Sequence, residues 1–120
     1  MQIYTSRYDN GSLAVRGDIA PIGISLYRPR WRLPYALAGS VRALAPSKSL
    51  WGLDEYQYII RYIDALNRLD ILDLRKQIET LAAGKHACLL CYEDLTEEWC
   101  HRRMFAEWWE VKTGEKITEL

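Results

Sequence analysis

The 120-residue sequence has no excess of charge of either sign, because 16 lysines and arginines balance 16 aspartates and glutamates. Proteins that bind nucleic acid without sequence preference are usually basic, so this balance argues against that function and leaves room only for a local basic patch. The sequence also lacks an apolar run close to the roughly 18 residues that a membrane span requires. Residues 1–5 do not combine a basic region with an apolar core, so we expect no signal peptide and a cytoplasmic protein.

Cysteine is scarce in the sequence, and phenylalanine is almost absent. The three cysteines are an odd number in a chain without an export signal, so we expect reduced thiols. Five tryptophans and eight tyrosines accompany a single phenylalanine, and rings that carry a polar atom favour half-buried surfaces such as ligand pockets. Repeats and low-complexity segments are also missing. We therefore expect one domain over residues 1–120, with a tail that frays from about residue 114.

Three segments have the composition of β-strands. Residues 3–5, Ile-Tyr-Thr, form a short segment of this kind. In residues 21–27 the aliphatic side chains at 22, 24 and 26 alternate with glycine, serine and tyrosine, as the two faces of a strand require. Residues 85–92 are apolar on both faces, which is typical of an interior strand in a parallel sheet. Residues 13–15 are consistent with either a further short strand or a loop.

Helical periodicity begins at Asp54, an expected N-cap with Gln57 as its capping-box partner. The apolar stripe expected to face the core of this helix is Tyr56, Ile59, Ile60, Ile63 and Leu66. A second helix is expected over residues 70–82, and a third begins between residues 96 and 99 and stops at Gly114. The order of elements predicts an α/β fold: a single layered domain with a small, largely parallel sheet flanked by helices.

Polar and aromatic side chains gather where the predicted strands end. In open parallel sheets, ligands bind beyond the carboxyl ends of the strands, so we expect these side chains to converge on one cleft. Residues 28–34 form a loop stiffened by two prolines, and its arginines and tryptophan are expected to lie over the same cleft. The side chains predicted to bind a ligand are Tyr4, Ser6, Ser25, Tyr27, Arg30, Trp31 and Arg102. The same arginines and rings are also consistent with a solvated basic edge and with core packing.

Cys100, His101 and Arg102 are consecutive at the expected start of the last helix. A helix N-terminus and a neighbouring cation both favour a thiolate, so Cys100 is a candidate nucleophile with a lowered pKa. His101 and Glu93 are the other candidate catalytic groups, with Glu93 as a general acid or base. Each has a structural alternative: a small buried cysteine, a histidine that packs locally, and a glutamate that pairs with an arginine.

The cysteines and His101 also suggest a zinc site, which we discount. Cys88 and Cys91 lie three apart in an expected strand and therefore face opposite sides, whereas a zinc knuckle needs a turn between its cysteines. A thioredoxin-like pair would lie at a helix start. The Cys-to-Arg spacing of six that marks tyrosine phosphatases is also missing. We therefore predict no metal and no cofactor.

Several segments resemble the domain-of-unknown-function 488 family of small bacterial and phage proteins. The matching segments are residues 3–6, 21–25, 29–31, 44–46, 89–93, 100–102 and 106–108. The most specific of them are Leu-Cys-Tyr-Glu and the Cys-His-Arg triplet that follows it. The resemblance implies a single α/β domain with the triplet at the start of the last helix. It also implies that Glu93, Cys100, His101 and Arg102 are signature residues, and it implies no defined activity.

Together, these patterns predict a cytoplasmic protein that binds a small anionic or nucleotide-like ligand at the strand carboxyl ends, with or without catalysis. The alternative is a non-enzymatic module that binds nucleic acid, weakly, or a protein through the loop of residues 28–34. In a third interpretation, the Cys-His-Arg triplet is purely structural. No membrane partner is expected.

Overall fold

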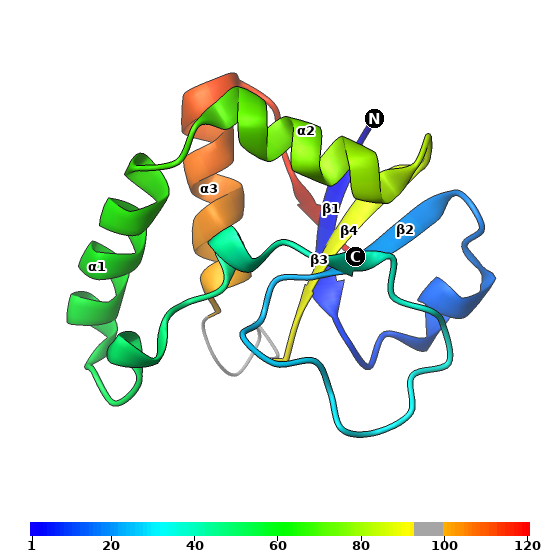
Figure 1. The fold of residues 1–120 in the computed structure, drawn as a ribbon, viewed down its shortest axis with the longest axis horizontal. Helices are drawn as coiled ribbons and strands as arrows, with labels where there is room; N and C mark the ends of the chain where they lie inside the picture. The colour runs from blue at the N-terminus through cyan, green and yellow to red at the C-terminus, as the bar shows by residue number, and fades with distance from the viewer. Residues whose placement is uncertain (93–99) are drawn as a thin grey trace.

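The protein is described here from a computed structural model, which covers residues 1–92 and 100–120 (Figure 1). These residues form a five-stranded sheet in the order β3-β2-β4-β1-β5, and every pair of neighbouring strands is parallel. The strands are β1 (Ile3–Arg7), β2 (Ile19–Gly23), β3 (Gly39–Ser40), β4 (His86–Cys91) and β5 (Thr118–Glu119). The α-helices are α1 (Glu55–Asn67), α2 (Ile71–Ala82) and α3 (His101–Thr113). The predicted α/β fold with a parallel sheet is confirmed.

Strand β4 lies at the centre of the sheet, between β1 and β2. Residues 87–91 are all buried, as their continuous apolar run predicts. Ala87, Leu89 and Cys91 belong to the main hydrophobic core, whereas Cys88 and Leu90 belong to a second cluster. Because side chains alternate along a strand, the two clusters lie on opposite faces of the sheet.

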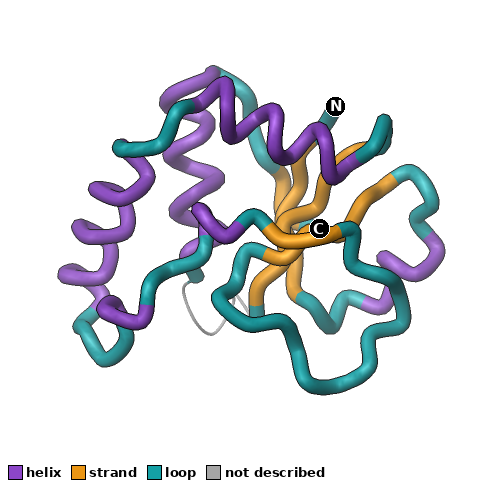
Figure 2. The backbone as a smooth tube through the Cα atoms, in the orientation of Figure 1, coloured by secondary structure: helices purple, strands orange, loops and turns teal. Residues whose placement is uncertain are grey.

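The three α-helices of the described residues cover the face of the main core, and Figure 2 shows them grouped to one side of the strands. Their fully or nearly buried core residues are Tyr62 and Leu66 of α1, Leu74, Ile78 and Ala82 of α2, and Phe105, Trp108 and Trp109 of α3. The contribution of α3 to the core is thus wholly aromatic among its buried hydrophobic residues. None of the helices in the described residues is long and apolar enough to cross a membrane.

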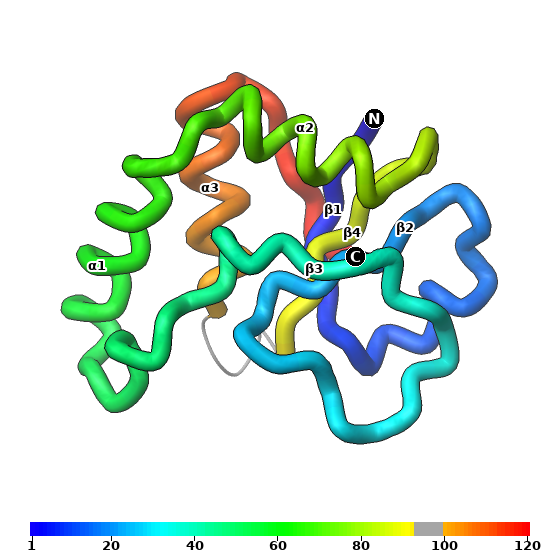
Figure 3. The backbone as a smooth tube through the Cα atoms, in the orientation of Figure 1, coloured from blue at the N-terminus to red at the C-terminus, as the bar shows by residue number. Residues whose placement is uncertain are grey.

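The opposite face is covered by irregular chain. Leu33, Tyr35 and Leu37, from the long segment between β2 and β3, pack against the second cluster together with Leu13 from a 3-10 turn at Gly11–Val15. Figure 3 shows this segment as a wide cyan loop beside the strands. Alternate residues of this stretch point inward, which leaves Pro34, Ala36 and Ala38 exposed. The 3-10 turn replaces the strand or loop that the sequence suggests at residues 13–15.

The start of α1 is confirmed, but its expected apolar stripe is wrong in part. The side chain of Asp54 accepts a hydrogen bond of 2.8 Å from the amide of Gln57, as predicted. Tyr56, however, is 70% exposed, while Tyr62 enters the core and donates a hydrogen bond to the carbonyl of Leu44. Since α1 lies at the periphery of the molecule, only a narrow edge of the helix reaches the core (Figure 1).

The tail after Gly114 is also ordered, where the sequence suggests fraying. Gly114 ends α3 with a φ of 77°, which glycine adopts readily. The chain then returns to the sheet as β5, which pairs with β1. The amide of Leu120 donates a 2.7 Å hydrogen bond to the carbonyl of Thr5. A two-residue edge strand carries too little pattern to be predicted from sequence.

Candidate functional site

A pocket of about 380 Å³ lies beyond the carboxyl ends of β2 and β4, and we call it the β2–β4 pocket. Its aromatic lining consists of Tyr27, Trp51, Tyr58 and Tyr92. Its polar and sulfur-containing lining consists of Ser25, Cys91 and His101. His101, the first residue of α3, lines the pocket, so the start of this helix adjoins it. This position is the one at which open parallel sheets bind ligands.

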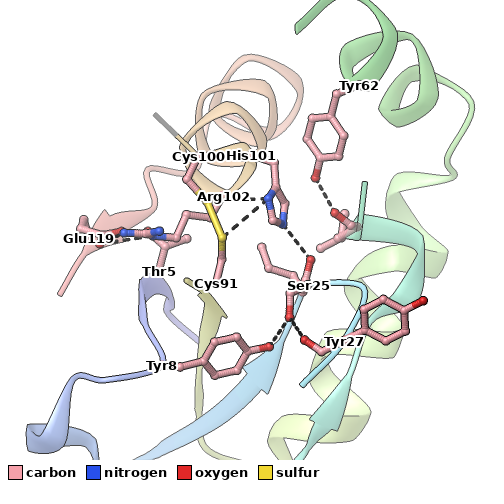
Figure 4. Close-up of a disulfide and its surroundings, with 12 residues drawn as sticks. Thr5, Tyr8, Ser25, Tyr27, Tyr62, Cys91, Cys100, His101, Arg102 and Glu119 are labelled. Atoms are coloured by element: carbon pink, nitrogen blue, oxygen red, sulfur yellow. Dashed lines mark hydrogen bonds and ion pairs between the residues drawn. A yellow bond between two sulfur atoms is a disulfide. The ribbon is translucent and has the colours of Figure 1, made fainter. Parts of the chain in front are cut away.

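Cys91, the last residue of β4, forms a disulfide with Cys100, the N-cap of α3 (Figure 4). The expectation of reduced thiols is therefore wrong for this pair. The reason lies in strand alternation, because Cys91 points to the face that α3 covers. Cys88 points to the other face and is free and buried, and burial raises its pKa to about 12.

His101 is 5% exposed and lies beside the disulfide. Its Nε2 is 2.8 Å from the carbonyl oxygen of Ile24, which can only accept, so Nε2 carries the ring proton. Its Nδ1 is 3.6 Å from the sulfur of Cys91 and 3.6 Å from that of Cys100. Burial lowers the pKa of His101 to about 4, so the ring is neutral at neutral pH and the lone pair of Nδ1 faces both sulfurs.

Neighbouring residues of a helix point about 100° apart, so Cys100 and His101 are not expected to meet. They meet because Cys100 is not helical. It is the N-cap, with extended backbone angles of −143° and 148°. This extended residue turns the thiol side chain toward the imidazole of the first helical position.

A chain of hydroxyl groups holds the segment that follows β2. The hydroxyl of Ser25 donates to the carbonyl of Tyr27 at 2.7 Å and accepts from the hydroxyl of Tyr8, also at 2.7 Å. The hydroxyl of Tyr92 donates to the same carbonyl of Tyr27 at 2.7 Å. Gly23 permits this arrangement, because a Cβ at this residue would lie 2.7 Å from the Tyr8 hydroxyl. Figure 4 shows Ser25 between the Tyr8 hydroxyl and the backbone of Tyr27, and both Ser25 and Tyr27 line the pocket.

Arg102 is fully buried and points away from the pocket (Figure 4). Its Nη2 forms an ion pair of 2.9 Å with Glu119 of β5, and the hydroxyl of Thr5 donates to the same carboxylate at 2.7 Å. Nη1 has no hydrogen-bond partner among the residues that the structure describes. Because Arg102 follows His101 by one helical position, the two side chains face different parts of the molecule.

The remaining predicted site residues lie outside the pocket lining. Tyr4 packs beside the second cluster, and buried Ser6 accepts a hydrogen bond from the Asn10 side chain on that same face of β1. Arg30 is exposed, and Trp31, which is 51% exposed, touches the pocket only through an edge contact of its ring with Tyr92. Glu93 lies outside the described residues. The structure therefore brings Ser25, Tyr27 and His101 together in the pocket lining, with Cys100 beside His101. Arg30 and Arg102 do not line this pocket.

Sequence reasoning missed Cys91, Trp51 and Tyr58 as parts of this site. The signal for Cys91 was its position at the end of a central strand, on the face that the last helix covers. Trp51 lies in a stretch without periodicity, so nothing in the sequence places it near β4. Comparison with family models, with curated proteins and with solved structures finds no match for this chain.

Proposed function

We propose that the protein binds a small anionic ligand with a flat ring, of the nucleotide type, in the β2–β4 pocket. The observation that carries this proposal is the aromatic lining, since the faces of Tyr27, Trp51, Tyr58 and Tyr92 offer stacking surfaces for a planar ring. The volume of about 380 Å³ falls within the roughly 300–1,000 Å³ of small-molecule sites.

The charges near the pocket favour an anion. The ammonium group of Lys48 lies 5.5 Å from the ring centre of Tyr27 and 6.0 Å from that of Trp51. None of the described residues that line the pocket is acidic.

Titration calorimetry with adenosine monophosphate tests the proposal, with Trp51→Leu and Trp31→Leu as matched variants. Both tryptophans are about half exposed, at 55% and 51%, but only Trp51 lines the pocket. We expect Trp51→Leu to weaken binding about tenfold, the effect of one lost stacking contact, and Trp31→Leu to leave it unchanged. No heat of binding with the unaltered protein, or equal losses in the two variants, would overturn the proposal.

The second candidate function is a binding module for single-stranded nucleic acid that uses the loop of residues 28–34. Arg30, Trp31 and Arg32 of this loop are all exposed, which favours contact with a large partner. An oligonucleotide would then bind with a salt slope of only about one unit per phosphate contact. In that case Trp31→Leu, and not Trp51→Leu, would reduce binding.

A further inference from the structure

We propose that reduction of the Cys91–Cys100 disulfide creates a metal site, in which the two cysteine thiolates and Nδ1 of His101 bind one Zn²⁺ ion. This assignment goes beyond the ligand pocket and stands on separate observations. Among the described residues, these three form a cluster whose ligand atoms all lie within 4.8 Å of one another.

The distances between the ligand atoms match a tetrahedral zinc site. Zinc bonds of about 2.3 Å to sulfur and 2.0–2.1 Å to nitrogen place the two ligand atoms about 3.6 Å apart. In the protein, Nδ1 of His101 is 3.6 Å from the sulfur of Cys91 and 3.6 Å from that of Cys100. Nδ1 of His101 therefore already lies at the distance from each sulfur that a shared zinc ion requires.

The sulfur atoms must separate for a metal to bind, and the backbone leaves room for this. Two thiolates on one tetrahedral zinc lie about 3.8 Å apart. The Cα atoms of Cys91 and Cys100 are 7.6 Å apart, beyond the roughly 4.4–6.8 Å of most disulfides. Once the bond is reduced, rotation of the two side chains is sufficient, and neither β4 nor α3 has to move.

The second nitrogen of His101 supplies independent support. A metal-binding histidine nearly always donates its other ring N–H to a carbonyl or a carboxylate, which fixes the tautomer and the orientation of the ring. Nε2 of His101 donates to the carbonyl of Ile24 at 2.8 Å, and Nδ1 is thereby left unprotonated and directed at the sulfurs (Figure 4).

Two thiolates and one imidazole suit zinc, and they leave its fourth coordination position open. Two thiolates neutralise the charge of the ion, which a site with ligands only 1–5% exposed requires. Three protein ligands are typical of zinc sites whose fourth position takes water or a substrate. Because Cys91 and His101 line the β2–β4 pocket, that fourth position faces the ligand proposed above.

The redox step is an ordinary thiol–disulfide exchange with a dithiol reductant. The dithiol gives two electrons and two protons to the disulfide and becomes a disulfide itself, and Cys91 and Cys100 become thiols. Zinc then binds both sulfurs as thiolates and releases two protons. In a reducing compartment such as the cytoplasm, thiols of this kind stay reduced, which favours the metal-bound form.

Cobalt(II), a spectroscopic substitute for zinc, tests the proposal on the whole folded chain. The protein is first reduced with dithiothreitol and then freed of reductant without oxygen. We expect one cobalt per chain, with the visible bands of tetrahedral cobalt and the near-ultraviolet bands of thiolate ligands, and displacement of cobalt by zinc. The oxidised protein provides the internal control and should show none of these bands.

Matched variants assign the ligands. His101→Gln should weaken cobalt binding by at least about tenfold, whereas the same change at His86, the other histidine of the sequence, should have no effect. Cys91→Ala and Cys100→Ala should remove the thiolate bands of one ligand each, and Cys88→Ala should retain both. Circular dichroism of each variant verifies the fold. Absence of the bands in the reduced, folded protein, or bands that His101→Gln leaves unchanged, would overturn the metal site.

Discussion

At the scale of the residue, His101 is the most constrained side chain of the site. Its buried ring packs edge-on against Tyr62, the carbonyl of Ile24 accepts a hydrogen bond from one nitrogen, and two sulfurs face the other nitrogen. Its charged form is disfavoured by burial, so the pKa falls from 6.5 to about 4. This pKa shift links the stability of the fold to pH.

The oxidised protein should lose stability in acid through this residue. Between pH 6.5 and 4 the unfolded chain binds a proton at His101 that the folded chain does not, so the free energy of unfolding decreases as pH falls. The loss attributable to His101 approaches about 3 kcal/mol at pH 4. Urea unfolding between pH 6.5 and 4 should show this loss of unfolding free energy in the unaltered protein and in His86→Gln. The loss should be smaller in His101→Gln. A parallel pH profile in all three proteins would contradict the assignment.

Arg102 has a structural role, which is the third interpretation that the sequence allows for the Cys-His-Arg triplet. Its guanidinium is buried, and its carboxylate partner Glu119 is 35% exposed. Glu119→Ala would leave a buried charge unpaired, and we expect a loss of about 2 kcal/mol in the free energy of unfolding. The control is Glu107→Ala, which removes an exposed ion pair with Arg103 and should change stability by less than about 0.5 kcal/mol. Similar effects from the two changes would argue against this role.

At the scale of the element, the sequence predicts the features that depend on residues close together in the chain, such as the ends of helices and an apolar strand. Asp54, Gly114 and the apolar run of β4 follow short-range rules, and the structure confirms each of them. Cys91 and Cys100 lie nine residues apart, and their pairing depends on how α3 packs against β4, which no local rule encodes. Of the residues predicted to share one cleft, only some therefore come together beyond the carboxyl ends of the strands.

The cap of α1 offers a test at this scale. Asp54→Ala removes the acceptor for the amide of Gln57, and the loss of an N-cap costs about 1 kcal/mol of unfolding free energy. Asp64→Ala, on the same helix, breaks only an exposed ion pair with Arg68 and should cost less than about 0.5 kcal/mol. Thermal or urea unfolding distinguishes the two. Equal losses would mean that the cap does not stabilise the helix.

At the scale of the whole molecule, the disulfide joins the centre of the sheet to the helical layer. Closing a loop with a sequence separation of nine should stabilise the fold by about 2–3 kcal/mol relative to the reduced chain. Urea unfolding with and without dithiothreitol, in a metal-free buffer, measures this difference. Cys88→Ala should preserve it, since Cys88 is free. A reduced protein as stable as the oxidised one would show that the bond does not contribute to global stability.

The central position of β4 has a consequence for biosynthesis. β1 and β2 come from the first 23 residues, yet neither pairs with the other, and both form their hydrogen bonds with a strand that begins at His86. While the ribosome makes the intervening chain, β1 has no strand to join, and β2 can join only the two-residue strand β3. They are exposed to chaperones and to aggregation until residues 86–91 leave the exit tunnel. The two halves of the sheet should therefore join late, when β4 pairs with β1 and β2, and β5 can only add to β1 after that.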